Sequence, residues 1–210
     1  MDKKIRGSFI AFEGIDGSGK STQIRLLSDR LREQAIPFYT TMEPTDSPIG
    51  SLIHQIMTGR VKTDNKVIAA LFVADRLDHL LNDVNGIVRK IEEGTTVIMD
   101  RYYFSSYAYQ SVDLPMDWVI QANGPSSDIL RPTANIFIDT DPDRALERIA
   151  NNRFQKELFE DRARLVQTRE KYMEAFDKLQ NVEHVAIIDG NRSEGEVAQD
   201  VWNAVKVYFR

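Results

Sequence analysis

The segment FEGIDGSGKST, residues 12–22, has the residue types and the spacing that bind nucleotide phosphates. Gly14, Gly19, Lys20 and Ser21 fall at the fixed positions of the P-loop pattern. Glycines let consecutive backbone N–H groups turn toward an anion, and a helix that begins near the lysine adds the positive end of its dipole. The lysine reaches the outer phosphates of such ligands, and the serine binds the Mg²⁺ that bridges them. We therefore predict a nucleoside triphosphate site formed by Gly14, Ile15, Asp16, Gly17, Ser18, Gly19, Lys20, Ser21 and Thr22.

This motif alone does not distinguish a kinase from a GTPase or an ATP-driven switch. GTPases commonly recognise guanine with Asn-Lys-x-Asp after a late strand. Here the letters TDNK at 63–66 stand in another order and precede a predicted helix. We therefore expect ATP as the phosphoryl donor.

Asp100 ends a predicted strand at 95–100 and should face the P-loop, and Arg101 follows it on a loop. A carboxylate there can hold a metal through water, so we predict Ser21 and Asp100 as the protein side of a Mg²⁺ site. The planar guanidinium of Arg101 suits a phosphate. The alternative is a local ion pair that caps a turn, because surface pairs of this kind are common.

Phe72 and Arg76 are four residues apart in a predicted helix and therefore share one face. A ring beside a guanidinium can stack on a nucleobase and donate to its carbonyl edge. Taken alone, Phe72 is better explained as a core residue. Arg76 shifts the interpretation toward a base site, because a buried arginine needs a partner.

Short apolar runs at 8–13, 38–43, 95–100, 134–139 and 184–189 predict five strands. Helical patterns separate them, at 20–35, 65–84, 141–150, 163–179 and 193–209. This alternation predicts an α/β fold with a doubly wound parallel five-stranded sheet, and we expect one domain over residues 1–210. Ligands of such sheets bind at the carboxyl ends of strands, where both groups of polar residues occur.

The composition argues against several functional classes. The net charge of −5 argues against a nucleic-acid-binding surface, which normally needs a basic excess. The absence of cysteine excludes disulfides, a thiolate zinc site and a cysteine nucleophile. The N-terminus lacks the apolar stretch of a signal peptide, and no apolar run is long enough for a membrane span. We therefore expect a cytoplasmic protein without a nucleic-acid or membrane partner.

Five segments occur in the order and with the spacing seen in thymidylate kinases: FEGIDGSGKST, EPTDSPIG, LFVADR, DRYYFSSYAYQ, and LERIA followed by R and FE. The fourth segment is the most specific, and the likeness extends from Phe9 to the end of HVAIID. This resemblance implies a P-loop kinase fold with a short mobile lid, phosphoryl transfer from ATP to dTMP, and a homodimer.

The resemblance also implies roles for individual residues. Asp16 resembles the carboxylate that binds the 3′-hydroxyl of the acceptor. Phe72 resembles the ring that stacks on thymine, and Arg76 the residue that contacts a thymine carbonyl oxygen. Arg101 resembles the clamp on the acceptor phosphate, and Asp100 matches the position associated with magnesium. The other positions implied around the acceptor are Glu43, Pro44, Ser105, Tyr109 and Gln110.

An arginine from the P-loop or the lid meets the charge of the moving phosphoryl group in this family. Gly17 stands where some members carry that arginine, so we expect it from the lid, at about 148–160. Arg153 is the first choice and Arg148 the second, whereas Arg144 is expected to be structural. The alternative for Arg153 is a solvated charge at a helix end. The predicted catalytic residues are Lys20, Arg101, Arg153 and Asp16.

One departure from the family pattern is Met42, which stands where many members have an arginine before the Glu-Pro pair. Two alternatives for the function remain open. In a deoxynucleoside kinase, Glu13 would deprotonate a hydroxyl acceptor. In a non-catalytic nucleotide-binding switch, Phe72, Arg76 and Gln110 would be core and surface residues.

Overall fold

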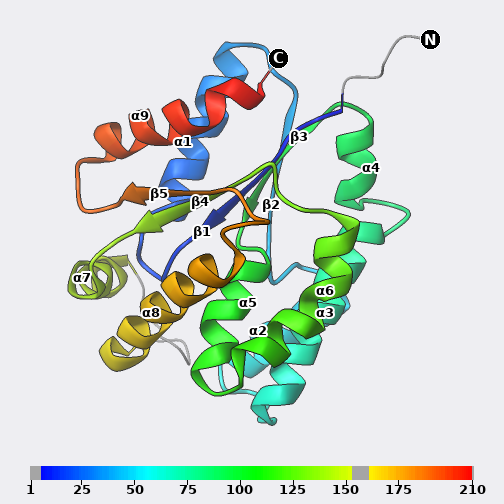
Figure 1. Cartoon of the computed structure of the whole chain (residues 1–210), viewed down its shortest axis with the longest axis vertical. Coiled ribbons are helices and arrows are strands. Elements are labelled where there is room, and N and C mark those ends of the chain that lie inside the picture. The colour runs from blue at the N-terminus through cyan, green and yellow to red at the C-terminus, as the bar shows by residue number, and fades with distance from the viewer. Residues whose placement is uncertain (1–5, 153–160, 210) are drawn as a thin grey trace.

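The computed structural model describes residues 6–152 and 161–209. Its centre is a parallel five-stranded sheet with the order β2-β3-β1-β4-β5 (Figure 1). The strands are β1 (Phe9–Glu13), β2 (Phe38–Met42), β3 (Thr96–Asp100), β4 (Ala134–Asp139) and β5 (Val185–Asp189). Each strand lies within one residue of its predicted range, and the doubly wound α/β fold is confirmed.

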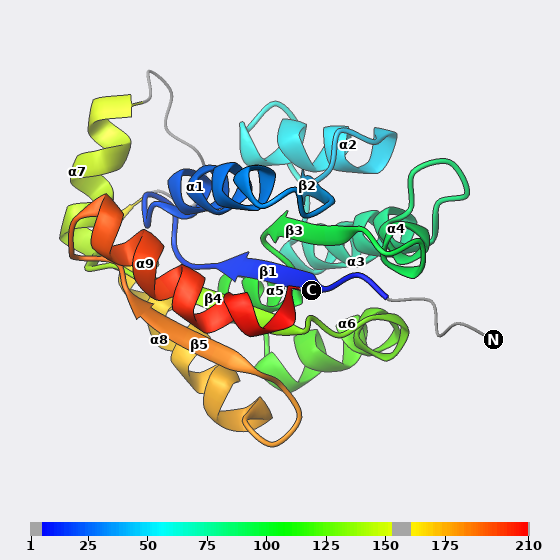
Figure 2. The ribbon, with the colours of Figure 1, turned by 90° about the horizontal axis from the view of Figure 1, so that it is seen from above.

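Helices cover both faces of the sheet (Figures 1 and 2). They are α1 (Lys20–Glu33), α2 (Pro48–Met57), α3 (Asn65–Leu81), α4 (Ile87–Glu92), α5 (Tyr103–Tyr109), α6 (Met116–Ile129), α7 (Pro142–Asn152), α8 (Arg162–Leu179) and α9 (Glu194–Val205). Helices α1 and α9 pack together on one face, and α5 packs with α8 and α6 on the other. No helix within the described residues is long and apolar enough to cross a membrane.

Alternate side chains of each strand enter two separate cores. Phe9 and Ala11 of β1 belong to the core beneath α5 and α8, whereas Ile10 and Phe12 belong to the core beneath α1 and α9. This period of two, with both faces covered, explains why the central strands β1, β3 and β4 are largely apolar on both faces.

Helices α2, α4, α5 and α6 were not predicted. Helix α5 consists entirely of buried residues, so its sequence has no polar face from which a helical period could be recognised. Helix α6 contains Pro125 in its interior, a residue that normally argues against a helix. Helix α2 has Pro48 at its first position, and the side chain of Ser47 caps it by accepting from the N–H of Gly50 at 3.1 Å.

The carboxyl ends of three strands meet at one edge of the sheet. Asp100 at the end of β3 lies opposite Phe12 of β1 and opposite Met42 of β2. Strand β1 lies between β3 and β4, where the order of the chain reverses, and the P-loop follows it directly. This is the switch point at which ligands of doubly wound sheets bind.

Candidate active site

The P-loop joins β1 to α1 through backbone conformations that favour glycine. Gly19 precedes α1 with a φ of 99°, and Gly17 has a φ of 74°. A Cβ atom at Gly17 would lie 2.3 Å from the carbonyl oxygen of Ala145 in α7. Because α7 packs this closely on the loop, position 17 has no room for a larger side chain.

The ammonium group of Lys20 is folded back onto the loop. Its Nζ donates to the carbonyl oxygen of Gly14 at 3.0 Å and to that of Ile15 at 3.1 Å. Burial, reinforced by the positive charge of Arg101, lowers the pKa of Lys20 to about 8. The side chain is therefore a cation whose charge is easily lost above neutral pH.

Ser21 and Asp100 bring two oxygen ligands together between α1 and β3. Ser21 Oγ donates to Asp100 Oδ2 at 3.1 Å, and Asp100 Oδ1 is buried without a hydrogen-bond partner in the described part of the chain. Within the described residues, no cluster of three or more His, Cys, Asp or Glu side chains could hold a metal ion. Ser21 and Asp100 supply two oxygen ligands, which fits a Mg²⁺ ion that takes its other ligands from water and phosphate oxygens.

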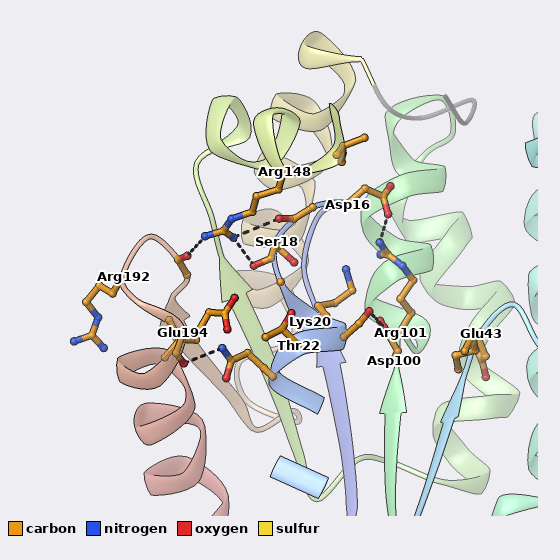
Figure 3. Close-up of a pocket in the computed structure, with 18 residues that line it drawn as sticks. Asp16, Ser18, Lys20, Thr22, Glu43, Asp100, Arg101, Arg148, Arg192 and Glu194 are labelled. Atoms are coloured by element: carbon orange, nitrogen blue, oxygen red, sulfur yellow. Dashed lines mark hydrogen bonds and ion pairs between the residues drawn. The ribbon is translucent and has the colours of Figure 1, made fainter. Parts of the chain in front are cut away.

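A cavity of about 510 Å³ opens over the P-loop (Figure 3). It reaches from Arg101 past Lys20 and Thr22 to the connection that follows β5. Its lining includes residues that the sequence analysis did not identify: Gln23, Ile149, Gly190, Arg192, Glu194 and Val197. Gly190 directly follows a predicted strand, so its position at a strand's carboxyl end was the signal available for this segment.

Arg148 of α7 connects the P-loop to the β5–α9 connection (Figure 3). Its guanidinium donates to the carbonyl oxygens of Ser18 at 3.1 Å, Gly17 at 3.4 Å and Gly190 at 3.1 Å. Thr140 Oγ1 donates to the same Ser18 carbonyl at 3.0 Å. In a trans peptide the N–H points opposite to the C=O. Holding these carbonyls on the outside of the loop therefore turns the next N–H groups inward, toward an anion.

Arg101 lies at the centre of a network between the P-loop and α5. Its Nη2 donates to Asp16 Oδ1 at 2.6 Å and to the Tyr109 hydroxyl at 3.2 Å, while Nη1 donates to Gly14 O and Ser105 Oγ, both at 3.1 Å. The Tyr109 hydroxyl donates to Asp16 Oδ2 at 2.9 Å. The φ of Arg101 is 69°, a conformation that is uncommon outside glycine and concentrates at functional sites. A ligand that binds Arg101 and Asp16 has to share or replace these bonds.

Glu13, at the end of β1, lies beneath this network. Its carboxylate accepts from the N–H of Tyr102 at 2.9 Å, from Ser105 Oγ at 2.6 Å and from the Tyr172 hydroxyl at 3.0 Å. Complete burial raises the pKa of the Glu13 carboxyl. Glu13 is not among the described residues that line either cavity, so this geometry does not favour the general base that a deoxynucleoside kinase needs.

A second cavity, of about 50 Å³, adjoins the first. Every residue predicted around the acceptor lines it: Asp16, Glu43, Pro44, Phe72, Arg76, Arg101, Ser105, Tyr109 and Gln110. Met57 and Ser106, which the sequence analysis did not single out, also line it. Three of these residues, Asp16, Glu43 and Arg101, line both cavities.

Arg76 has a partner within the chain. Its side chain is 1% exposed, and its Nη2 lies 2.7 Å from Oε2 of Glu43. Phe72, by contrast, is half-buried and belongs to neither core among the described residues. The two residues of the predicted helical face therefore both border the second cavity.

Some predicted residues lie elsewhere. Arg153 and the rest of 153–160 are outside the described residues, so the role of Arg153 stays a prediction. Gly14 and Ile15 are not among the described residues that line the two cavities, and their carbonyl oxygens bind Lys20 instead. Arg144 donates to the carbonyl oxygen of Asn191.

The fold and the two cavities define a P-loop kinase, a class in which a phosphate donor and an acceptor meet at the end of the first strand. Residues 12–201 match the family model of thymidylate kinase. The chain therefore belongs to the thymidylate kinase family.

Relatives from distant organisms agree with this match. The chain is 36% identical to the thymidylate kinase of Symbiobacterium thermophilum, over 94% of this chain and 92% of that protein. It is 39% identical to a probable thymidylate kinase of Pyrobaculum calidifontis, over 92% and 93% of the two chains. A probable thymidylate kinase of Methanocaldococcus jannaschii is 35% identical, over 98% and 97%.

Proposed function

We propose that this protein transfers the γ-phosphoryl group of ATP to dTMP, yielding dTDP and ADP. The observation that carries the proposal is the meeting of two cavities at Asp16, Glu43 and Arg101. One cavity contains the P-loop, and the other contains the positions at which the chain resembles the dTMP site of its family. A phosphoryl group that moves between them travels past Arg101.

On the donor side, backbone N–H groups of Gly17, Ser18 and Gly19 and the first turn of α1 bind the phosphates of ATP. Lys20 leaves the carbonyl oxygens of the loop and contacts the outer phosphates. Ser21 and Asp100 hold Mg²⁺, which neutralises charge on the phosphates when it is bound. Two observations support this assignment: the hydrogen bond between these two side chains, and the buried Oδ1 of Asp100, which has no partner among residues 6–152 and 161–209.

On the acceptor side, the thymine ring stacks on Phe72, and a carbonyl oxygen of the base accepts from Arg76. Asp16 accepts from the 3′-hydroxyl, and Arg101 binds the 5′-phosphate. The remaining acceptor positions border the same pocket: Pro44, Ser105, Tyr109 and Gln110. The position of all these side chains around one small cavity supports a single ligand on the acceptor side.

The chemistry needs no separate general base. The attacking atom is a phosphate oxygen, which is already anionic at neutral pH, so positioning and charge neutralisation supply the catalysis. Arg101 and Lys20 stabilise charge that spreads over the moving group, and a lid arginine, Arg153, completes this set in our proposal.

A homodimer and a cytoplasmic location, both expected from the sequence, belong to the same proposal and rest on the family resemblance and the composition.

An acceptor panel in a coupled ADP-release assay tests the function. With ATP and Mg²⁺, we expect dTMP to stimulate ADP release strongly and thymidine not to do so. Equal or better turnover of thymidine would favour a deoxynucleoside kinase. A protein that binds ATP but releases no ADP with any nucleoside monophosphate would favour a non-catalytic switch.

A further inference from the structure

Arg76 is held inside the protein by a carboxylate and two neutral side chains. Its Nε donates to Glu43 Oε2 at 2.8 Å, and Nη2 lies 2.7 Å from the same oxygen. Nη1 donates to Ser106 Oγ at 3.1 Å and also to Asn123 Oδ1. Arg76 and Glu43 are both buried, with side chains 1% exposed. The guanidinium is therefore fixed from three sides, by the residue that follows β2, by α5 and by α6.

Counting the donors shows what Arg76 has left to offer. A guanidinium carries five N–H groups. Nε uses its single N–H on Glu43 and Nη1 uses both of its N–H groups, whereas Nη2 forms an ion pair with the same Glu43 oxygen at 2.7 Å, which accounts for one of its two N–H groups. Among the described residues, one N–H on Nη2 is left without a protein partner. Because Arg76 lines the acceptor cavity, this single donor is the one that a base could accept from.

Glu43 is itself held by α3. His79 Nδ1 lies 3.2 Å from Glu43 Oε1, and His79 Nε2 lies 2.8 Å from Thr41 Oγ1. A carboxylate can only accept, so Nδ1 carries the proton, and in a neutral ring Nε2 accepts from the Thr41 hydroxyl. The Glu43 carboxylate is therefore fixed at both oxygens, between an arginine and a histidine of the same helix.

The loop after Glu43 is attached to α3 by a separate contact. Asp75 accepts from the N–H of Thr45 at 2.8 Å, from Thr45 Oγ1 at 2.6 Å and from Ser47 Oγ at 3.0 Å. Asp75 is fully buried, and within the described part of the chain its carboxylate forms no hydrogen bond or ion pair with the Arg76 side chain. The position of the loop and the position of the guanidinium are thus set by different carboxylates.

We propose that Glu43 is a positioning residue, which orients Arg76 so that its remaining N–H selects an acceptor base with a carbonyl oxygen over one with an amino group. The inference rests on the proposed function and adds the origin of base selectivity to it. Glu43 turns its side chain toward α3, so it acts through Arg76 and does not itself contact the base. Thymine offers a carbonyl oxygen at the ring position where cytosine carries an amino group, so dTMP and dCMP are the informative pair.

The test compares the kinetics of Glu43→Gln with those of the unaltered protein for both acceptors. Glutamine keeps the shape but lacks the charge, and its NH₂ group cannot accept a hydrogen bond from Arg76. We expect KM for dTMP to rise about tenfold, because a hydrogen bond to a charged group is lost or weakened. The ratio of kcat/KM for dTMP to that for dCMP should fall by a similar factor. The kcat for dTMP and KM for ATP should stay within about twofold.

Two variants separate this role from general loosening of the structure. Asp75→Asn removes a buried carboxylate that holds the same loop, and Glu183→Gln removes one that binds Tyr103 and Arg131 away from both cavities. Both should keep the dTMP to dCMP ratio of the unaltered protein. If Glu43→Gln does not fold, Glu43→Asp gives the same test with the charge kept and withdrawn by one methylene, and its selectivity should fall less.

The inference is overturned if a folded Glu43 variant keeps the normal KM and base selectivity, or if Asp75→Asn lowers selectivity as much. Failure of the proposed function would look different. In that case the unaltered protein itself would release no ADP with dTMP, whatever residue stands at position 43.

Discussion

The donor side and the acceptor side of the active site are built in different ways. The phosphate-binding part of the donor side is one continuous segment, 16–22, and its main binding groups are backbone amides at the start of a helix. The acceptor cavity combines side chains from the P-loop, the end of β2, α3 and α5. The donor cavity has about ten times the volume, about 510 Å³ against about 50 Å³.

The two sides also differ in how their charges are satisfied. On the acceptor side, Arg101 is paired with Asp16 and Arg76 with Glu43. A ligand there has to supply groups that replace or extend existing hydrogen bonds, and an analogue that lacks them leaves polar groups unpaired. On the donor side, Lys20 contacts neutral carbonyl oxygens, and phosphates are a better partner for it. We infer that the donor side contributes mainly charge stabilisation, and that the acceptor side contributes selectivity in addition to the charge stabilisation by Arg101.

The largest effect is expected from Lys20→Met, which removes the donor-side cation. We expect kcat to fall about 10³-fold, because a buried group that stabilises transition-state charge is lost. The melting temperature should change little, since burial already disfavours the charge of Lys20. Lys62→Met, at an exposed position, is the matched control. A folded Lys20→Met protein with normal turnover would contradict the assignment.

Arg101→Gln perturbs the acceptor side. We expect kcat/KM for dTMP to fall about 10²-fold, because the fork that binds the phosphate is lost. Affinity for ATP, measured by calorimetry, should change less than threefold. Arg162→Gln, in an exposed ion pair with Asp143, is the control and should behave like the unaltered protein. An equal loss of affinity for ATP would mean that the two sides are not separable in this way.

The pH dependence of kcat/KM for ATP reports the charge of Lys20 in the free enzyme. Burial lowers the pKa of Lys20 to about 8, and triphosphate binding favours its charged form. We therefore expect kcat/KM for ATP to be constant below about pH 7.5 and to fall roughly tenfold per pH unit well above pH 8. A profile that stays flat to pH 9.5 would show that the charge of Lys20 is not lost in this range.

The smallest effect is expected from Arg148→Gln, which releases the outer carbonyls of the P-loop. The dissociation constant for ATP should rise about fivefold, as expected when one or two hydrogen bonds that preorganise the amides are lost. Affinity for dTMP should stay unchanged. A 10³-fold fall in kcat with normal affinity for ATP would instead make Arg148 the arginine that meets the transferred group.

The same contrast explains how much of the molecule could be predicted from the sequence. The strands and the P-loop are contiguous, so apolar runs and glycine spacing were sufficient to find them. Phe72 and Arg76 could be placed on one face because helical spacing is local. Helix α5 could not be recognised, since its burial on all sides removes the polar period that predicts a helix.

The pairing of the charged side chains could not be predicted. Arg76 and Glu43 are 33 residues apart, and Arg101 and Asp16 are 85 residues apart. Such contacts depend on how β2, β3 and α3 are placed, which no local pattern encodes. The sequence indicated that a buried Arg76 needs a partner. The fold shows that this partner is the carboxylate of Glu43, which the sequence did not predict.

The most direct measurement is a crystal structure with a bisubstrate analogue that joins thymidine to adenosine through a phosphate chain. We expect the thymine ring to lie against Phe72 and Arg76, the phosphate chain to cross Arg101 and the P-loop, and the adenosine to lie toward Gly190, which lines the donor cavity. A thymidine group bound outside the cavity bordered by Phe72 and Arg76 would contradict it.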